Sequence, residues 1–202
     1  MKTEVPKLVL ASRSPRRAAL LRQIGFAFDV KHAEVPEHVD PDADPEETVL
    51  RLSAAKAEAV LPGVKKGLVI GADTVVVLDG ELLGKPADAA EASEMLRKLS
   101  GKTHRVFTGF TLIDAESGSR HAGIERTDVT FRALEPWEIE GYVSSGAPMD
   151  KAGAYGIQDR SGLFVERIEG CFYNVVGFPL TKFYEGLKIL WGAEALRGAL
   201  QP

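Results

Sequence analysis

The sequence predicts an α/β fold with a mixed central sheet, in which helices join some neighbouring strands and tight hairpins join others. Strand and helix patterns alternate along the 202 residues, which is typical of strands connected by helical crossovers. Two turn sequences interrupt that alternation, Asp79-Gly80 and the segment from Glu116 to Ser119. Because short turns join antiparallel strands, we expect parallel and antiparallel pairs in one sheet.

A strand, a helix and a second strand open the chain. Leu8 to Ala11 is a short apolar run of the kind found in buried strands. Ser14 is suited to cap a helix that has Pro15 at its first position, and Gly25 closes that helix. Phe26 to Val30 then predicts the second strand.

A second helix, the central strand and a third helix follow. Acidic residues in the first turn suit a helix over Asp44 to about Val60. Leu68 to Leu78, LVIGADTVVVL, is apolar and β-branched, which is typical of a central strand, and its one polar break is Asp73-Thr74. A third helix, with an aspartate as its cap, is predicted over Asp88 to about Leu99.

The second half of the chain predicts two hairpins and two helices. In chain order these are paired strands at His104 to Ile113 and Arg120 to Arg132, a helix from about Pro136 to Ser144, a hairpin of Leu163 to Ile168 with Phe172 to Val176, and a helix starting at Pro179. A glycine-rich stretch separates the first of these helices from the second hairpin.

Composition excludes several classes of function. The chain is 45% hydrophobic with a formal net charge of -4, so a basic face for nucleic acid is not predicted. No run approaches the roughly 20 apolar residues of a membrane helix, and the first apolar stretch is too short for a secretory signal. Cys171 is the only cysteine, so no intramolecular disulfide can form. We expect one domain over residues 1–202, in the cytoplasm, with no nucleic-acid or membrane partner.

Three familiar catalytic patterns are missing from the sequence. SGKT at Ser100 to Thr103 is not a phosphate loop, because Leu96 stands where that motif needs glycine and because the segment follows a helix. The histidines show no metal-ligand spacing, and no serine lies in a G-x-S-x-G pattern. The chemistry must therefore use carboxylates and cations.

Asp73 is the sharpest candidate residue because it interrupts an apolar strand, where an unpaired carboxylate is costly. It is either a strand-end acid bonded to backbone amides, or a group that holds a divalent cation or takes a proton from water. The acidic, proline-rich loop from His32 to Asp44 includes Glu34 and Glu37. One of its acids can complete a magnesium site with Asp73, because Mg²⁺ typically takes one or two protein carboxylates plus phosphate oxygens and water.

The candidate cations each have two interpretations. Arg16 and Arg17 lie in the first turn of a helix, where the dipole disfavours cations, so they are either solvated or form an anion site with the helix N-terminus. Lys56 and Lys85 are either surface lysines or phosphate contacts. DKAGAYGIQ, Asp150 to Gln158, is either a tight loop or a wall for a flat ring, with its glutamine suited to the edge of a base.

These segments together resemble the Maf-like nucleotide pyrophosphatases, and within them the branch that acts on dTTP and UTP. The matching segments, in family order, are LASRSPRR, RLSAAKA, VIGADTVV, GKP, RKLSGKTHRVFTG, DKAGAYGIQ and VVGFPL, which extend from residue 8 to about 184. The resemblance implies a curved, mixed sheet flanked by helices, with two lobes around a cleft, as in the Maf and inosine-triphosphatase type of fold. It also implies magnesium or manganese as the cofactor and commonly a homodimer.

The resemblance assigns roles to single residues. It makes Asp73 the general base, with Glu37 as a second carboxylate near the metal. It associates Arg16, Thr74 and Gln158 with the choice of base. The phosphate-cleft positions are Ser12, Arg17, Lys56 and Lys85. Pro36 departs from the family, which usually has an acidic residue there, and weaker metal binding follows if that acid matters.

Three hypotheses for function follow. The first is a housecleaning hydrolase that converts dTTP, UTP and modified pyrimidine triphosphates to the monophosphate and pyrophosphate, with water attacking the α-phosphorus. The second is a nucleotide-binding regulator of cell division or septum formation that needs no turnover. An Asp73→Asn variant separates these two hypotheses, because it should abolish hydrolysis and leave nucleotide binding largely intact. The third is a purine-triphosphate enzyme of the inosine-triphosphatase type, which would prefer ITP or XTP.

Overall fold

The computed structural model describes residues 7–32, 34–36 and 43–199, and within them it forms one mixed sheet. The strands are β1 (Leu8–Ala11), β2 (Phe28–Lys31), β3 (Leu68–Leu78), β4 (Glu81–Leu83), β5 (Thr103–Asp114), β6 (Arg120–Phe131) and β7 (Val165–Glu169). Their order is β2-β1-β3-β5-β6-β7, with β4 also paired to β3. The pairs of β1 with β2 and β3 are parallel, whereas β3, β5, β6 and β7 pair antiparallel, which confirms the predicted mixed sheet.

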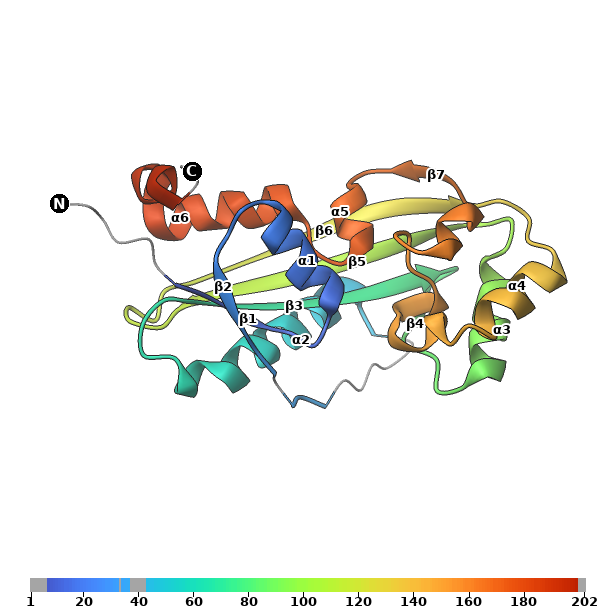
Figure 1. The fold of residues 1–202 in the computed structure, drawn as a ribbon, viewed down its shortest axis with the longest axis horizontal. Helices are drawn as coiled ribbons and strands as arrows, with labels where there is room; N and C mark the ends of the chain where they lie inside the picture. The colour runs from blue at the N-terminus through green and yellow to red at the C-terminus, as the bar shows by residue number, and fades with distance from the viewer. Residues whose placement is uncertain (1–6, 33, 37–42, 200–202) are drawn as a thin grey trace.

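Helices cover both faces of this sheet (Figure 1). They are α1 (Pro15–Gln23), α2 (Pro45–Val60), α3 (Ala89–Leu99), α4 (Pro136–Val143), α5 (Phe172–Val176) and α6 (Leu180–Ala199). Helix α2 packs on one face, over β3 and β5, while α1, α5 and α6 lie on the other. Helices α3 and α4 cover the far end of the long strands. No helix of the described ranges has the length and apolarity that crossing a membrane requires.

Side-chain caps fix the starts of the first three helices, and two of these caps, Ser14 and Asp88, are the predicted ones. The side chains of Ser14, Asp44 and Asp88 each accept a hydrogen bond from the backbone amide three residues later. Such a cap satisfies one of the amides that have no partner inside the helix. The turn between β3 and β4 also agrees with prediction, because Asp79 and Gly80 both have positive φ, 53° and 91°, as a tight hairpin turn requires.

The predicted hairpin near the C-terminus is wrong. Strand β7 pairs with β6, and Phe172–Val176 forms the short helix α5 instead of a strand. The fully buried Asn174 explains the difference, because its Nδ2 donates to the backbone oxygen of Val106 at 2.9 Å and to Thr127 Oγ1 at 2.8 Å. These tertiary hydrogen bonds outweigh the strand propensity of a β-branched and aromatic segment.

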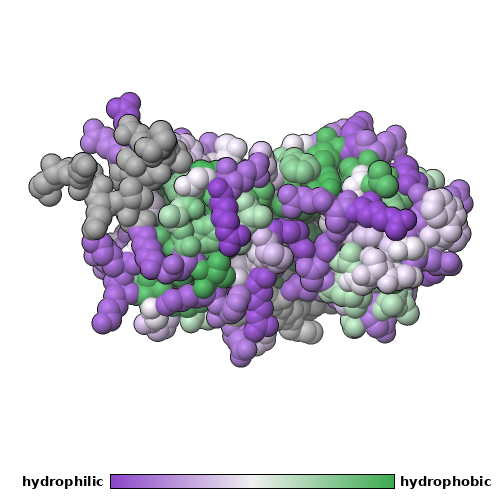
Figure 2. All heavy atoms as spheres, viewed as in Figure 1, coloured by the Kyte–Doolittle hydropathy of each residue, from purple (hydrophilic) through white to green (hydrophobic). Residues whose placement is uncertain are grey.

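The core consists of two main clusters that divide the molecule into two halves. One joins α1 and α6 to β1 and the start of β3, and the other joins α3 and α4 to the end of β3 and to β6. Figure 2 shows hydrophilic side chains gathered around a hollow between these halves. This arrangement confirms the expected two lobes around a cleft.

Candidate active site

The cleft is a cavity of about 740 Å³ at the carboxyl end of β1. Strand β1 pairs with β3 only as far as Gly71, and β4 begins to pair with it at Val76, so the edge of β3 between them faces the cavity. Side chains from both faces of β3 therefore reach the same space. Ligands of open α/β sheets bind in this kind of position, beyond the carboxyl ends of parallel strands.

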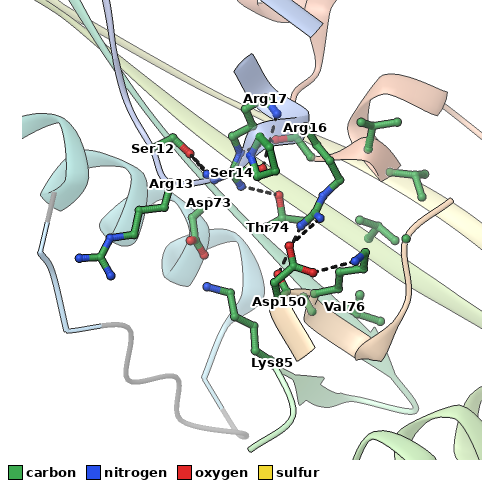
Figure 3. A pocket seen from close by; sticks show the side chains of 18 of the residues that line it. Ser12, Arg13, Ser14, Arg16, Arg17, Asp73, Thr74, Val76, Lys85 and Asp150 are labelled. Atoms are coloured by element: carbon green, nitrogen blue, oxygen red, sulfur yellow. Dashed lines mark hydrogen bonds and ion pairs between the residues drawn. The ribbon is translucent and has the colours of Figure 1, made fainter. Parts of the chain in front are cut away.

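Asp73 is buried in the cavity wall and forms an ion pair with Lys56 of α2. Its Oδ1 lies 2.5 Å from Lys56 Nζ. Figure 3 shows the side chain of Lys85 pointing toward the same carboxylate. The mid-strand acid is therefore paired with a cation, which removes the alternative of a turn acid bonded to backbone amides. A carboxylate beside two lysines suits a site that handles phosphate charge.

Arg17 is anchored on the opposite face of β3 from Lys56. Its Nε donates to the backbone oxygen of Gly177 at 2.8 Å, and its Nη2 donates to Thr74 Oγ1 at 2.9 Å. Its Nη1 lies 3.5 Å from Ser12 Oγ, which also accepts from the amide of Ser14. Arg17 as a whole residue is 9% exposed, and this predicted phosphate ligand forms part of the cavity wall.

The hydroxyl of Thr74 has a defined direction. Thr108 Oγ1 donates to the backbone oxygen of Asn174 at 3.1 Å, which uses its only proton. The 2.9 Å contact between Thr74 and Thr108 must then be donated by Thr74. The Thr74 oxygen also accepts a hydrogen bond from Arg17. Toward a ligand, this oxygen can therefore act only as a hydrogen-bond acceptor.

Arg16 lies at the mouth of the cavity and is held by Asp150 (Figure 3). Its Nη1 donates to Asp150 Oδ2 at 2.8 Å, and its Nη2 donates to the backbone oxygen of the same residue at 3.3 Å. Burial acts to raise the pKa of Asp150, but hydrogen bonds from Lys151 and Arg16 outweigh it and hold that pKa below its ordinary value. The positive charge of Arg16 at the start of α1 is therefore balanced by the carboxylate of Asp150.

The glycine-rich segment forms the wall facing α1. Tyr155 and Gln158 line the cavity, as the interpretation of DKAGAYGIQ as a wall predicts. The Tyr155 hydroxyl bonds to Nε2 of the buried His104 at 2.8 Å, and its ring packs edge-on against Phe131 and His104. Burial lowers the pKa of His104 to about 4 and raises that of Tyr155. Both groups are neutral at pH 7 and act as a rigid apolar support.

The structure brings the predicted site residues together, with one exception that lies outside the described residues. Those that line the cavity are Ser12, Arg16, Arg17, Lys56, Asp73, Thr74, Lys85 and Gln158. Glu37, the predicted second carboxylate near the metal, is not among the described residues. Asp150 and Lys151, the first two residues of the segment DKAGAYGIQ, also line the cavity, and the sequence indicates a role for them only through the cationic first turn of α1 that an acid must balance.

The donors in the cavity fit a magnesium or manganese ion only in part. Asp73 and Glu34 line it and supply the carboxylate oxygens that these ions prefer, although Glu34 pairs with Arg13 at 3.1 Å. The described ranges contain no group of three or more side chains that would hold a metal alone. This donor set suits an ion that takes most of its ligands from substrate phosphates and water, with Asp73 as its protein ligand.

A family model described as Maf-like protein matches residues 7–190. The chain belongs to this Maf-like family. A dTTP/UTP pyrophosphatase from Moorella thermoacetica is 48% identical over 190 residues, which cover 92% of this Maf-like chain and 98% of the relative. A dTTP/UTP pyrophosphatase from Caldicellulosiruptor saccharolyticus is 44% identical over 198 residues, covering 96% and 99%. The solved Ham1 protein of Staphylococcus aureus is 14% identical with a TM-score of 0.42, covering 62% of this chain and 71% of that one.

Proposed function

We propose that this Maf-like chain hydrolyses nucleoside triphosphates between the α- and β-phosphates, with dTTP and UTP as preferred substrates. The observation that carries the proposal is the cavity, in which the buried carboxylate of Asp73 lies among cationic side chains. A triphosphate needs such cations, and an attacking water needs such a base. The names of relatives that are 48% and 43% identical support the choice of dTTP and UTP. Modified pyrimidine triphosphates are proposed as further substrates because they are variants of the same bases.

The triphosphate would bind between the start of α1 and the two lysines. Amides at a helix N-terminus and guanidinium groups both bind phosphate oxygens well. Arg13, Lys56 and Lys85 line this part of the cavity. Arg17 and Ser12 also line the cavity, where hydrogen bonds hold them in its wall. The base would then lie toward Arg16, Thr74 and Gln158, which are the positions proposed to select it.

Asp73 would act as the general base. It accepts a proton from a water molecule while the water oxygen forms a bond to the α-phosphorus. The bond from that phosphorus to the bridging oxygen breaks, and pyrophosphate leaves with the electron pair. Lys56 and Lys85 stabilise the charge that develops on the phosphate oxygens. When a Mg²⁺ or Mn²⁺ ion is bound, by Asp73 and in the proposal also by Glu37, it supplies further neutralisation of phosphate charge.

Two further properties belong to the proposal. A cytoplasmic location agrees with the single cysteine, because a reducing compartment leaves it as a thiol. A homodimer is proposed from the family resemblance, and light scattering on the purified chain would measure it. A mass of one chain, 21.8 kDa, at micromolar concentration would contradict the dimer.

Pyrophosphate release across a panel of nucleotides tests the proposal. The purified chain is incubated with dTTP, UTP, dCTP, ITP, XTP and 7-methyl-GTP, in Mg²⁺, in Mn²⁺ and in EDTA. Phosphate is measured with and without added inorganic pyrophosphatase, which separates the two products. We expect dTTP and UTP to give the highest kcat/KM, with pyrophosphate as product and no turnover in EDTA. No turnover of any triphosphate, or orthophosphate as the direct product, would contradict the proposal.

A further inference from the structure

Arg16 and Asp150 connect the two walls of the cavity. Arg16 is the second residue of α1, and Asp150 ends a short helical turn at Ala147–Asp150, 134 residues further along the chain. Both nitrogens at the end of the guanidinium bond to this one residue, to its carboxylate at 2.8 Å and to its backbone oxygen at 3.3 Å. Two hydrogen bonds to one residue fix both the position and the plane of the guanidinium.

The other oxygen of Asp150 continues the connection toward Gln158. Lys151 Nζ donates to Asp150 Oδ1 at 2.7 Å and lies 3.5 Å from Asp159 Oδ2. The Lys151 side chain is 11% exposed, so this lysine is held against the wall, whereas the Asp150 carboxylate is 56% exposed and reaches solvent. Asp159 follows Gln158 directly in the sequence. A chain of alternating charges therefore runs from Arg16 to the backbone that carries Gln158.

The far end of this chain of charges is fixed firmly. Asp159 Oδ1 accepts from the amide of Ser161 at 2.9 Å and from its hydroxyl at 2.8 Å. The hydroxyl of Tyr142, on α4, also donates to Asp159 at 3.1 Å. Since Tyr142 is buried in the core of the second lobe, Asp150 ties Arg16 to a rigid part of the molecule.

We propose that Asp150 is a positioning residue for base selection, which holds the Arg16 guanidinium at a fixed place in the cavity that Gln158 also lines. This inference rests on the proposed function, because it assigns Arg16 and Gln158 to the base of the substrate. Asp150 acts through Arg16 and takes no part in the chemical step at Asp73. Its loss therefore weakens binding of the correct nucleotide and leaves the rate of the bound complex nearly unchanged.

A double-mutant cycle tests the inference. Steady-state kinetics with dTTP are compared for the wild type, Asp150→Asn, Arg16→Ala and the double variant. Asp150→Asn retains the shape of the side chain and removes its charge. We expect KM to rise about tenfold and kcat to stay within about threefold, as for loss of a charged hydrogen bond used in binding. In the Arg16→Ala background the same change should have less than about a twofold further effect.

The same cycle is measured at equilibrium with a dTTP analogue that has an imido group between the α- and β-phosphates. This second arm gives the coupling as a ratio of Kd values and needs no turnover. Glu81→Gln is the matched control, because Glu81 pairs with Lys98 at 3.3 Å and does not line the cavity. Its KM and Kd should equal those of the wild type.

The outcomes separate the two proposals. A wild type that binds the analogue but hydrolyses no triphosphate contradicts the proposed function, and the Kd cycle still decides the role of Asp150. An active wild type in which Asp150→Asn leaves KM unchanged overturns the inference alone. Multiplicative effects of the two substitutions overturn it as well, since Asp150 would then act independently of Arg16.

Discussion

Lys56 Nζ lies 2.5 Å from Oδ1 of Asp73, and only 10% and 11% of the two side chains are exposed. This ion pair joins α2 to the part of β3 between its pairings with β1 and β4, and it places one carboxylate at a fixed point of the cavity. Its two members have different roles in the proposed reaction, one as a base and the other as a cation for phosphate. Substitutions that remove each charge separately should therefore have different consequences.

Asp73→Asn should lower kcat for dTTP by about 100-fold or more, because an amide cannot accept the proton of the attacking water. Binding of the imido analogue of dTTP, measured in EDTA so that metal binding by Asp73 does not contribute, should stay within about threefold of the wild type, since the amide has the same shape. Asp79→Asn, in the exposed turn after the same strand, is the matched control and should be fully active. Retained turnover in Asp73→Asn would show that another group is the base.

Lys56→Met should destabilise the fold, because it leaves the Asp73 carboxylate in the wall without the ammonium group. We expect the free energy of unfolding in urea to fall by about 1 to 3 kcal/mol, the range for removing one partner of a buried charged hydrogen bond. Lys98→Met removes a more exposed lysine that pairs with Glu81, and it should change the free energy of unfolding by less than about 0.5 kcal/mol. Equal effects of the two substitutions would contradict this account.

Thr108→Val should weaken the discrimination between dTTP and dCTP. The Thr74 hydroxyl donates its hydrogen bond to Thr108 Oγ1, which leaves the Thr74 oxygen as an acceptor toward the ligand. Thymine and uracil present an N–H donor at N3, whereas cytosine presents an acceptor there. Without Thr108, the Thr74 hydroxyl is able to donate instead, so the ratio of kcat/KM for dTTP over dCTP should fall about tenfold.

Thr111→Val is the control for that substitution. Thr111 lies on the same strand, is buried, and bonds to Ser53 at 2.8 Å outside the cavity. The Thr111→Val variant should lose about as much stability as Thr108→Val, but it should keep the wild-type ratio of kcat/KM for dTTP over dCTP. If Thr108→Val also keeps the ratio, the orientation assigned to the Thr74 hydroxyl is wrong.

The stability of the fold should depend on pH through His104. Burial lowers the pKa of this histidine from 6.5 to about 4, so between these pH values the unfolded chain binds a proton that the folded chain does not. The free energy of unfolding should be highest above pH 6.5 from this cause and should fall by about 3 kcal/mol as pH drops to 4.

A His104→Gln variant isolates this contribution from that of the carboxylates. Urea unfolding of both proteins is measured at several pH values, and the difference between their slopes is the histidine's share. We expect the variant to be less stable at pH 7 and to lose less stability on acidification. Parallel pH profiles for the two proteins would contradict the assignment of a neutral, buried His104.

The helix starts and the central strand could be predicted because their signals are local. Ser14, Asp44 and Asp88 cap helices through hydrogen bonds that span only three residues. Asp73 stood out because every near neighbour on its strand except Thr74 is apolar or glycine. The sequence therefore predicted both the frame of the site and its most distinctive acid.

Contacts between distant segments could not be predicted in the same way. The Phe172–Val176 segment has the composition of a strand, and only the hydrogen bonds of Asn174 to β5 and β6 explain why it is helical. The pairing of Arg16 with Asp150 joins residues that have no local relation. The sequence indicates this pairing only through the first turn of α1, which has two arginines and no acidic residue.

The position of bond cleavage tests the central claim most directly. The chain is allowed to hydrolyse dTTP in water enriched in ¹⁸O, and the products are examined by mass spectrometry. If water attacks the α-phosphorus with Asp73 as base, one ¹⁸O atom enters thymidine monophosphate and none enters pyrophosphate. Label in pyrophosphate, or in released orthophosphate, would place the attack on another phosphorus and contradict the account.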